Sequence, residues 1–122
     1  MLELLNFVAF ALQAKNAKVA QTASIVGFNA LLCFKGNKAL LKNEIQRVME
    51  TALEALKKNI DPIETDSLLA VVLLLCRCLY ENPDAVEYAN GALFSKALWD
   101  FVKKPLDQKV KDAVSDVTQL LG

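Results

Sequence analysis

The chain has 122 residues, of which 54% are hydrophobic and 23% are charged. This length fits one domain with a single core, and the composition is too apolar for a disordered chain. The 14 basic and 14 acidic residues cancel, so no long-range field favours nucleic acid or a membrane surface, and we expect neither as a partner.

The residue types further limit the reactions and binding sites that the chain can support. There is no histidine, which removes the commonest general base and metal ligand, and the three cysteines fit free thiols in a reducing compartment. A secretion signal is not predicted because Glu3 stands where such a signal carries positive charge. The most apolar segment, 68–76, is shorter than the ~20 residues that a bilayer requires. We therefore expect an intracellular protein, cytoplasmic or nuclear, that is not an enzyme and uses no cofactor or metal.

The first predicted helix, 2–15, is apolar almost all round, because its large apolar residues cannot share one face. These residues are Leu4, Leu5, Phe7, Val8, Phe10 and Leu12. A helix of this kind needs cover on several sides. We therefore expect it to pack against a preceding repeat of a longer chain, of which these residues would be a fragment. The alternative is a second chain, as in a homo-oligomer.

The second predicted helix, about 18–34, places Val19, Ala23 and Val26 at i, i+4 and i+7. We predict that Gly36 ends it, since glycine accepts the left-handed cap conformation. The further helices predicted from periodicity and turn residues cover about 38–42, 44–58, 64–81, 83–88, 93–102 and 107–121. No segment alternates apolar and polar residues as a strand does, so the chain is predicted to be all-α.

The sequence repeats a pattern after about 45 residues, which aligns Cys33 with Cys78 and Asn37 with Asn82. Each copy continues through an apolar helix that ends at two lysines. These lysine pairs are Lys57 with Lys58 and Lys103 with Lys104. A spacing of roughly 40–47 residues is typical of helical arrays, which stack their units and offer an extended surface to a partner. The repeat thus indicates a binding protein.

Cys76 and Cys78 have the close spacing of a metal-binding pair. On a helix, however, two thiols at i and i+2 lie about 200° apart around the axis and cannot share one ion. We expect both, and Cys33, to be packing residues.

Residues 82–104 carry an Asn-Pro turn, a short helix, a corner at Asn90-Gly91 and an apolar helix. In this they resemble the first two helices of an armadillo repeat. Residues 108–115 and 18–24 resemble the opening of its third helix. The resemblance covers nearly the whole chain. It implies a single armadillo-like α-α superhelix over residues 1–122, with about two full three-helix repeats plus flanking helices.

The family's third helices line a concave groove that binds extended peptides. In nuclear-import receptors this groove carries ladders of Trp and Asn that hold basic peptides. Carried over through the Gly-Asn and Asn-Pro turns, the Trp positions fall on Asn29 and Leu74. The Asn positions fall on Cys33 and Cys78, and the one tryptophan, Trp99, lies on a predicted second helix. Recognition of a basic import signal is therefore not expected.

We predict a non-enzymatic scaffold module that binds a peptide or helix of another protein on the solenoid surface. The candidate groove residues are Ile25, Asn29, Cys33, Val71, Leu74, Arg77 and Cys78. Asn29 has two interpretations, a donor to a ligand backbone or an amide bonded to a nearby turn carbonyl.

The rival hypothesis is homo-oligomerisation, or stacking within a larger scaffold protein, through the exposed faces and above all the first helix. A weaker one is a membrane or nucleic-acid contact along the lysine pairs.

Overall fold

In a computed structural model of the whole chain, residues 1–122, every regular element is helical, which confirms the predicted all-α class. The elements in chain order are α1 (Leu2–Leu12), α2 (Ala17–Cys33), a 3-10 turn η1 (Lys38–Leu41), α3 (Lys42–Glu54), a π-helical turn η2 (Ala55–Asn59), α4 (Thr65–Leu79), α5 (Pro83–Gly91), α6 (Phe94–Phe101) and α7 (Gln108–Leu121).

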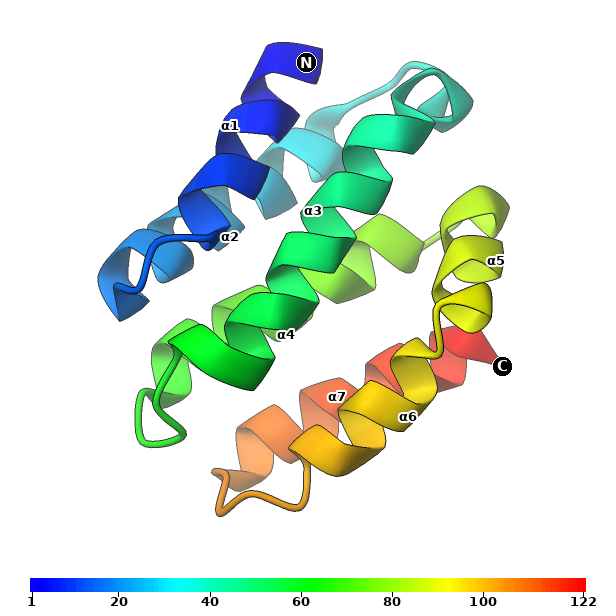
Figure 1. Cartoon of the computed structure of the whole chain (residues 1–122). Helices are drawn as coiled ribbons and strands as arrows, with labels where there is room; N and C mark the ends of the chain where they lie inside the picture. Colours follow the sequence, from blue (N-terminus) through cyan, green and yellow to red (C-terminus); the bar gives the residue numbers. More distant parts are fainter.

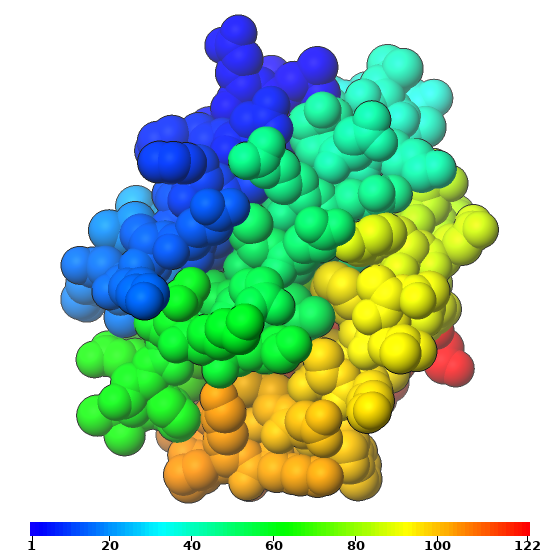
Figure 2. Space-filling model, viewed as in Figure 1, coloured from blue at the N-terminus to red at the C-terminus, as the bar shows by residue number.

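The helices form two layers. Helices α1, α3 and α6 lie in front in Figure 1, and α2, α4 and α7 lie behind them. Helix α4 packs between α2 and α7, and α1 packs beside α3. The space-filling view of the front layer shows side chains filling the spaces between α1, α3 and α6 (Figure 2). Helix pairs that follow one another in the sequence thus lie side by side, as in a helical repeat.

Asparagines begin the equivalent elements of the two copies. The side-chain oxygen of Asn37 accepts a hydrogen bond from the Ala39 N–H at 2.9 Å. That of Asn82, which is buried, accepts one from the Ala85 N–H at 3.3 Å. Such caps satisfy N–H groups that the first turn of a helix leaves without a partner. The Asn37–Asn82 match in the sequence therefore corresponds to two helix starts.

The predicted glycine cap of α2 is wrong. Helix α2 ends at Cys33, followed by the extended residue Phe34, and Gly36 does not have a positive φ. A Cβ on Gly36 would lie 2.6 Å from Cζ of Phe34. A larger residue at this position would displace the phenyl ring, which folds back over the turn.

The predicted corner at Asn90-Gly91 also differs from the structure. Both residues are still part of α5, and the left-handed residue is Leu93, with φ 61°. The Asn90 amide donates a hydrogen bond to the carbonyl of Leu121 at 3.2 Å, which holds the last turn of α5 against the end of α7. The corner therefore lies at Ala92 and Leu93, directly after α5.

Helices α2 and α4 are parallel and lie very close together. The Ser67 hydroxyl donates to the side-chain oxygen of Gln21 at 3.2 Å. Two turns further on, a Cβ on Gly27 would lie 3.0 Å from Cδ1 of Leu74 and 3.1 Å from Cγ1 of Val8. Residues of α2 thus meet those of α4 in the same order, and glycine lets α1, α2 and α4 meet at one point.

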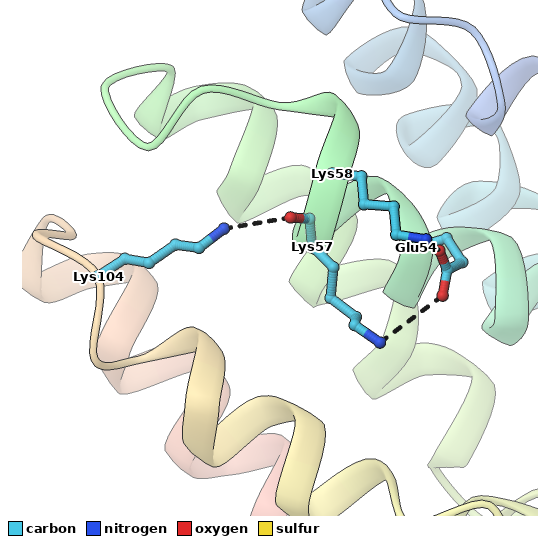
Figure 3. Close-up of polar contacts among 4 residues, drawn as sticks. All are labelled: Glu54, Lys57, Lys58 and Lys104. Carbon is cyan, nitrogen blue, oxygen red and sulfur yellow. Dashed lines mark hydrogen bonds and ion pairs between the residues drawn. The ribbon is translucent and has the colours of Figure 1, made fainter.

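The lysine pairs of the two copies bind groups within the chain (Figure 3). Lys57 and Lys58 both approach the carboxylate of Glu54, at 3.7 and 3.2 Å. The Lys104 amine donates to the main-chain carbonyl of Lys57 at 3.3 Å, across the boundary between the copies. This carbonyl belongs to the terminal turn η2, whose carbonyls have no partner in a following turn. The lysine edge thus joins successive copies.

The close approach at Gly27 generates a stability prediction. We expect Gly27→Val to lower the free energy of unfolding by about 1–3 kcal/mol, because the added methyl groups overpack the contact with Leu74 and Val8. Denaturant titration followed by circular dichroism measures this. Gly91→Ala is the matched control, since no atom lies within 4 Å of its added Cβ, and we expect it to change stability by no more than about 0.5 kcal/mol. Equal stability of the two variants would contradict the packing.

Candidate functional site

An open trough runs between α2 and α4, and these two helices alone line it. Its volume is about 310 Å³. The lining residues are Gln21, Ser24, Ile25 and Phe28 of α2 and Asp66, Leu69, Ala70 and Leu73 of α4. We call this feature the α2–α4 trough.

Helical periodicity explains why these residues share one surface. On α4, Asp66, Ala70 and Leu73 stand at i, i+4 and i+7, and Arg77 follows at i+11, so all four lie on one face. Ile25 of α2 belongs to a matching stripe. Because the two helices are parallel, their stripes lie side by side along the trough.

The floor of the trough is apolar and open to solvent. Ile25 is 48% exposed and Leu73 is 41% exposed, and Phe28 lies half-buried between the helices. Adjacent exposed apolar side chains of this size are typical of interaction surfaces. The Ser24 hydroxyl is buried beneath them without a hydrogen-bond partner, which costs about 1–3 kcal/mol.

Arg77 stands at one end of the trough, held by two aromatic rings. Its guanidinium carbon lies 5.6 Å from the ring centre of Phe28 and 4.6 Å from that of Tyr80. Cation–π contacts of this kind stabilise a guanidinium without using its N–H donors. The ion pairs of the chain lie elsewhere, and the buried Nε of Arg77 has no hydrogen-bond partner. The arginine is therefore held by two rings and takes part in no ion pair within the chain.

Two other hollows, each of about 450 Å³, lie along α6. One lies beside α6, and its lysines Lys57 and Lys104 already bind groups within the chain. The other lies between α6 and α7, with Trp99 and Val102 next to polar residues of α7. In the α2–α4 trough the apolar floor adjoins Asp66, which takes part in no ion pair, and the lining residue Phe28 contacts Arg77.

Of the sequence-predicted groove residues, two lie at the trough. Ile25 lines it and Arg77 closes its end. Asn29 and Cys33 are exposed, but they lie on the neighbouring face of α2 and not in the trough.

The other three require a correction, because Val71, Leu74 and Cys78 are buried, with 0%, 0% and 1% of their surface exposed. Packing of α4 between α2 and α7 encloses the face to which the family alignment pointed, as the approach of Leu74 to Gly27 shows. The solvent-exposed face of α4 is rotated by one residue, or about 100° around the helix axis, from the face that the family alignment predicted.

Sequence reasoning missed the members of the open stripe on α4, namely Asp66, Leu69, Ala70, Leu73 and Tyr80. The available signal was the pair of opposite charges, Asp66 and Arg77, at i and i+11 on an otherwise apolar helix. Charged residues on such a helix identify the face that stays in water.

The cysteines divide into two kinds. Burial raises the pKa of the Cys78 thiol to about 12. Burial, reinforced by the negative charge of Asp116, raises the pKa of the Cys76 thiol to about 11. Neither is an activated nucleophile. Cys33 is exposed, so the prediction that it is a packing residue is wrong.

No three cysteine or carboxylate side chains lie close enough together to hold a metal ion. No helix combines the length and the apolar character that a membrane span requires.

Comparison with known proteins adds no relative. The chain matches no protein-family model, no curated protein and no solved structure. The armadillo resemblance therefore rests on the sequence motifs, and a function has to be argued from the geometry of the trough.

Thiol exposure generates a prediction for alkylation. In the native protein at mildly alkaline pH, iodoacetamide should modify Cys33 and leave Cys76 and Cys78 unmodified, because burial keeps the latter two protonated. In denaturant all three should react. Mass spectrometry of proteolytic fragments locates the label, and modification of Cys78 at the rate of Cys33 would contradict the described core.

Proposed function

We propose that the protein is a non-enzymatic interaction module, built as an armadillo-like superhelix, that binds an extended segment of another protein in the α2–α4 trough. The observation that carries this proposal is an open apolar floor that ends at Arg77, an arginine clamped between two rings and without an ion pair.

The arrangement of the helices supports the armadillo-like part of the proposal. Helices α2, α4 and α7 stand where third helices would lie, and α1, α3 and α6 where second helices would lie (Figure 1). The short elements η1 and α5 occupy the first-helix positions. Each begins after a capping asparagine.

The shape of the trough favours an extended segment over a folded domain. Its volume lies at the lower end of the range of ligand pockets, roughly 300–1,000 Å³, and it is open along its length. An extended chain places alternate side chains on one side, where apolar ones would cover Ile25 and Leu73. Burial of exposed apolar surface would then supply affinity.

A second candidate function, self-association or stacking in a larger scaffold, is favoured by the bare end of the stack. Helix α1 covers α3 and α2 covers α4, but no helix covers the outer side of α1 and α2. Phe7 and Phe10 of α1 are 59% and 69% exposed, and Val19 of α2 is 40% exposed. These side chains make the end of the stack a surface on which another helix pair would pack.

For the trough, we expect Leu73→Asp to weaken binding of a trough peptide at least ten-fold, because a carboxylate would replace the apolar floor. Suitable peptides come from selection of a random displayed library on the wild-type protein, and fluorescence anisotropy measures their affinity. Phe10→Asp, on another helix but also at an exposed apolar residue, should leave the affinity unchanged. The proposal is wrong if no selected peptide depends on Leu73.

For the bare end, we expect the apparent mass of the wild-type protein to rise with concentration in analytical ultracentrifugation. Phe10→Asp should hold it at the mass of one chain, because the charge disrupts the apolar patch. Leu73→Asp should associate like the wild type. A wild-type protein that stays monomeric at all accessible concentrations would exclude self-association through α1.

A further inference from the structure

The two ends of the α2–α4 trough carry opposite charges that take part in no ion pair within the chain. Asp66 lines one end with an exposed carboxylate, and Arg77 stands at the other. The ion pairs of the chain involve Glu54 and Asp100 with nearby lysines, and neither trough charge takes part in one. The apolar floor thus lies between a free anion and a free cation.

The cationic end is preorganised for a carboxylate. Phe28 and Tyr80 hold the guanidinium between their rings, so little side-chain freedom remains to be lost on binding. Guanidinium groups bind carboxylates with two parallel hydrogen bonds, and no ion pair of the chain uses the guanidinium of Arg77. Lys38 strengthens the positive potential here, since its amine donates to the Tyr80 carbonyl at 2.9 Å.

Acidic residues of the chain do not occupy this position. The hollow beyond Arg77, of about 470 Å³, has Glu81 and Asp84 on its wall together with Lys35 and Lys38. No ion pair joins either acid to Arg77. Arg77 therefore has no carboxylate of its own chain within ion-pair distance.

The separation of the two charges sets the spacing of a ligand. Asp66 and Arg77 are eleven residues apart on one face of α4, which is roughly 16 Å along a helix. An extended chain advances about 3.3 Å per residue, so it covers this distance in about five residues. Between the two ends it passes over Leu73 and Ile25, which offer only apolar contacts.

We propose that the trough recognises an extended partner segment with a basic side chain at Asp66, an apolar side chain over the floor and an acidic side chain at Arg77. The two ligand charges are about five residues apart. This inference rests on the proposed function of the trough as a peptide site and adds the chemistry and direction of its occupant. Charge complementarity at the two ends aligns the segment, and the apolar contact supplies affinity.

The test is selection of a random displayed peptide library on the wild-type protein, followed by charge reversal on both sides. We expect the selected peptides to share a basic, an apolar and an acidic residue at this spacing.

Changing the acidic residue of the peptide to Lys should weaken binding at least ten-fold, and Arg77→Glu in the protein should restore much of that loss. The reciprocal test combines Asp66→Lys in the protein with a change of the basic residue of the peptide to Glu. Leu40→Asp, at an exposed leucine outside the trough, is the control.

The outcomes separate this inference from the proposed function. The inference is overturned if the selected peptides require Leu73 but lack the two charges. It is also overturned if Arg77→Glu does not restore the binding of peptides in which the acidic residue is changed to Lys. In both cases the trough remains a peptide site. If no selected peptide requires Leu73, both are overturned. Circular dichroism of each variant checks folding. The peptide substitutions leave the protein unchanged, so loss of binding on reversal of either peptide charge is decisive even if Arg77→Glu unfolds.

Discussion

The parallel contact between α2 and α4 is the interaction on which the rest of the structure depends. At its centre Gly27 faces Leu74 at a distance that leaves no room for a larger side chain without displacement. This contact sets the register in which Ile25 lies beside the open stripe of α4 and Phe28 lies against the guanidinium of Arg77. A shift by one residue would rotate either stripe by about 100° and remove the trough.

The helices packed around α4 both stabilise the fold and support the proposed binding site. This helix packs against α2, α3 and α7, so most of its apolar surface is used for the core. Only the stripe that ends at Arg77 remains in contact with solvent. Because the core immobilises the helix, Leu73 and Arg77 stand on a rigid support, which lowers the entropy lost when a partner binds. The bare outer side of α1 and α2 has no such enclosure, and it offers a flat patch in place of a shaped trough.

The sequence predicted the helices well and the site only in part, and the difference has a physical reason. Hydrophobic periodicity and helix capping depend on residues that are close in the sequence. The helix that begins after Asn82 was therefore predictable from a few residues. The open face of α4 depends on which neighbours pack around it, and an almost wholly apolar helix does not show this. The matched pair Cys33 and Cys78 illustrates the point, because Cys33 is exposed and Cys78 is buried although they occupy equivalent positions in the repeated pattern.

A double-mutant cycle between Gly27 and Leu74 tests the central contact most directly. Gly27→Ala adds a methyl group 3.0 Å from Leu74 Cδ1, and Leu74→Ala removes that atom. If the register is correct, Gly27→Ala is less unfavourable by about 0.5 kcal/mol or more in the Leu74→Ala background than in the wild type, measured by denaturant unfolding. Strictly additive effects of the two substitutions would mean that these residues do not touch, and the trough between α2 and α4 would then not exist.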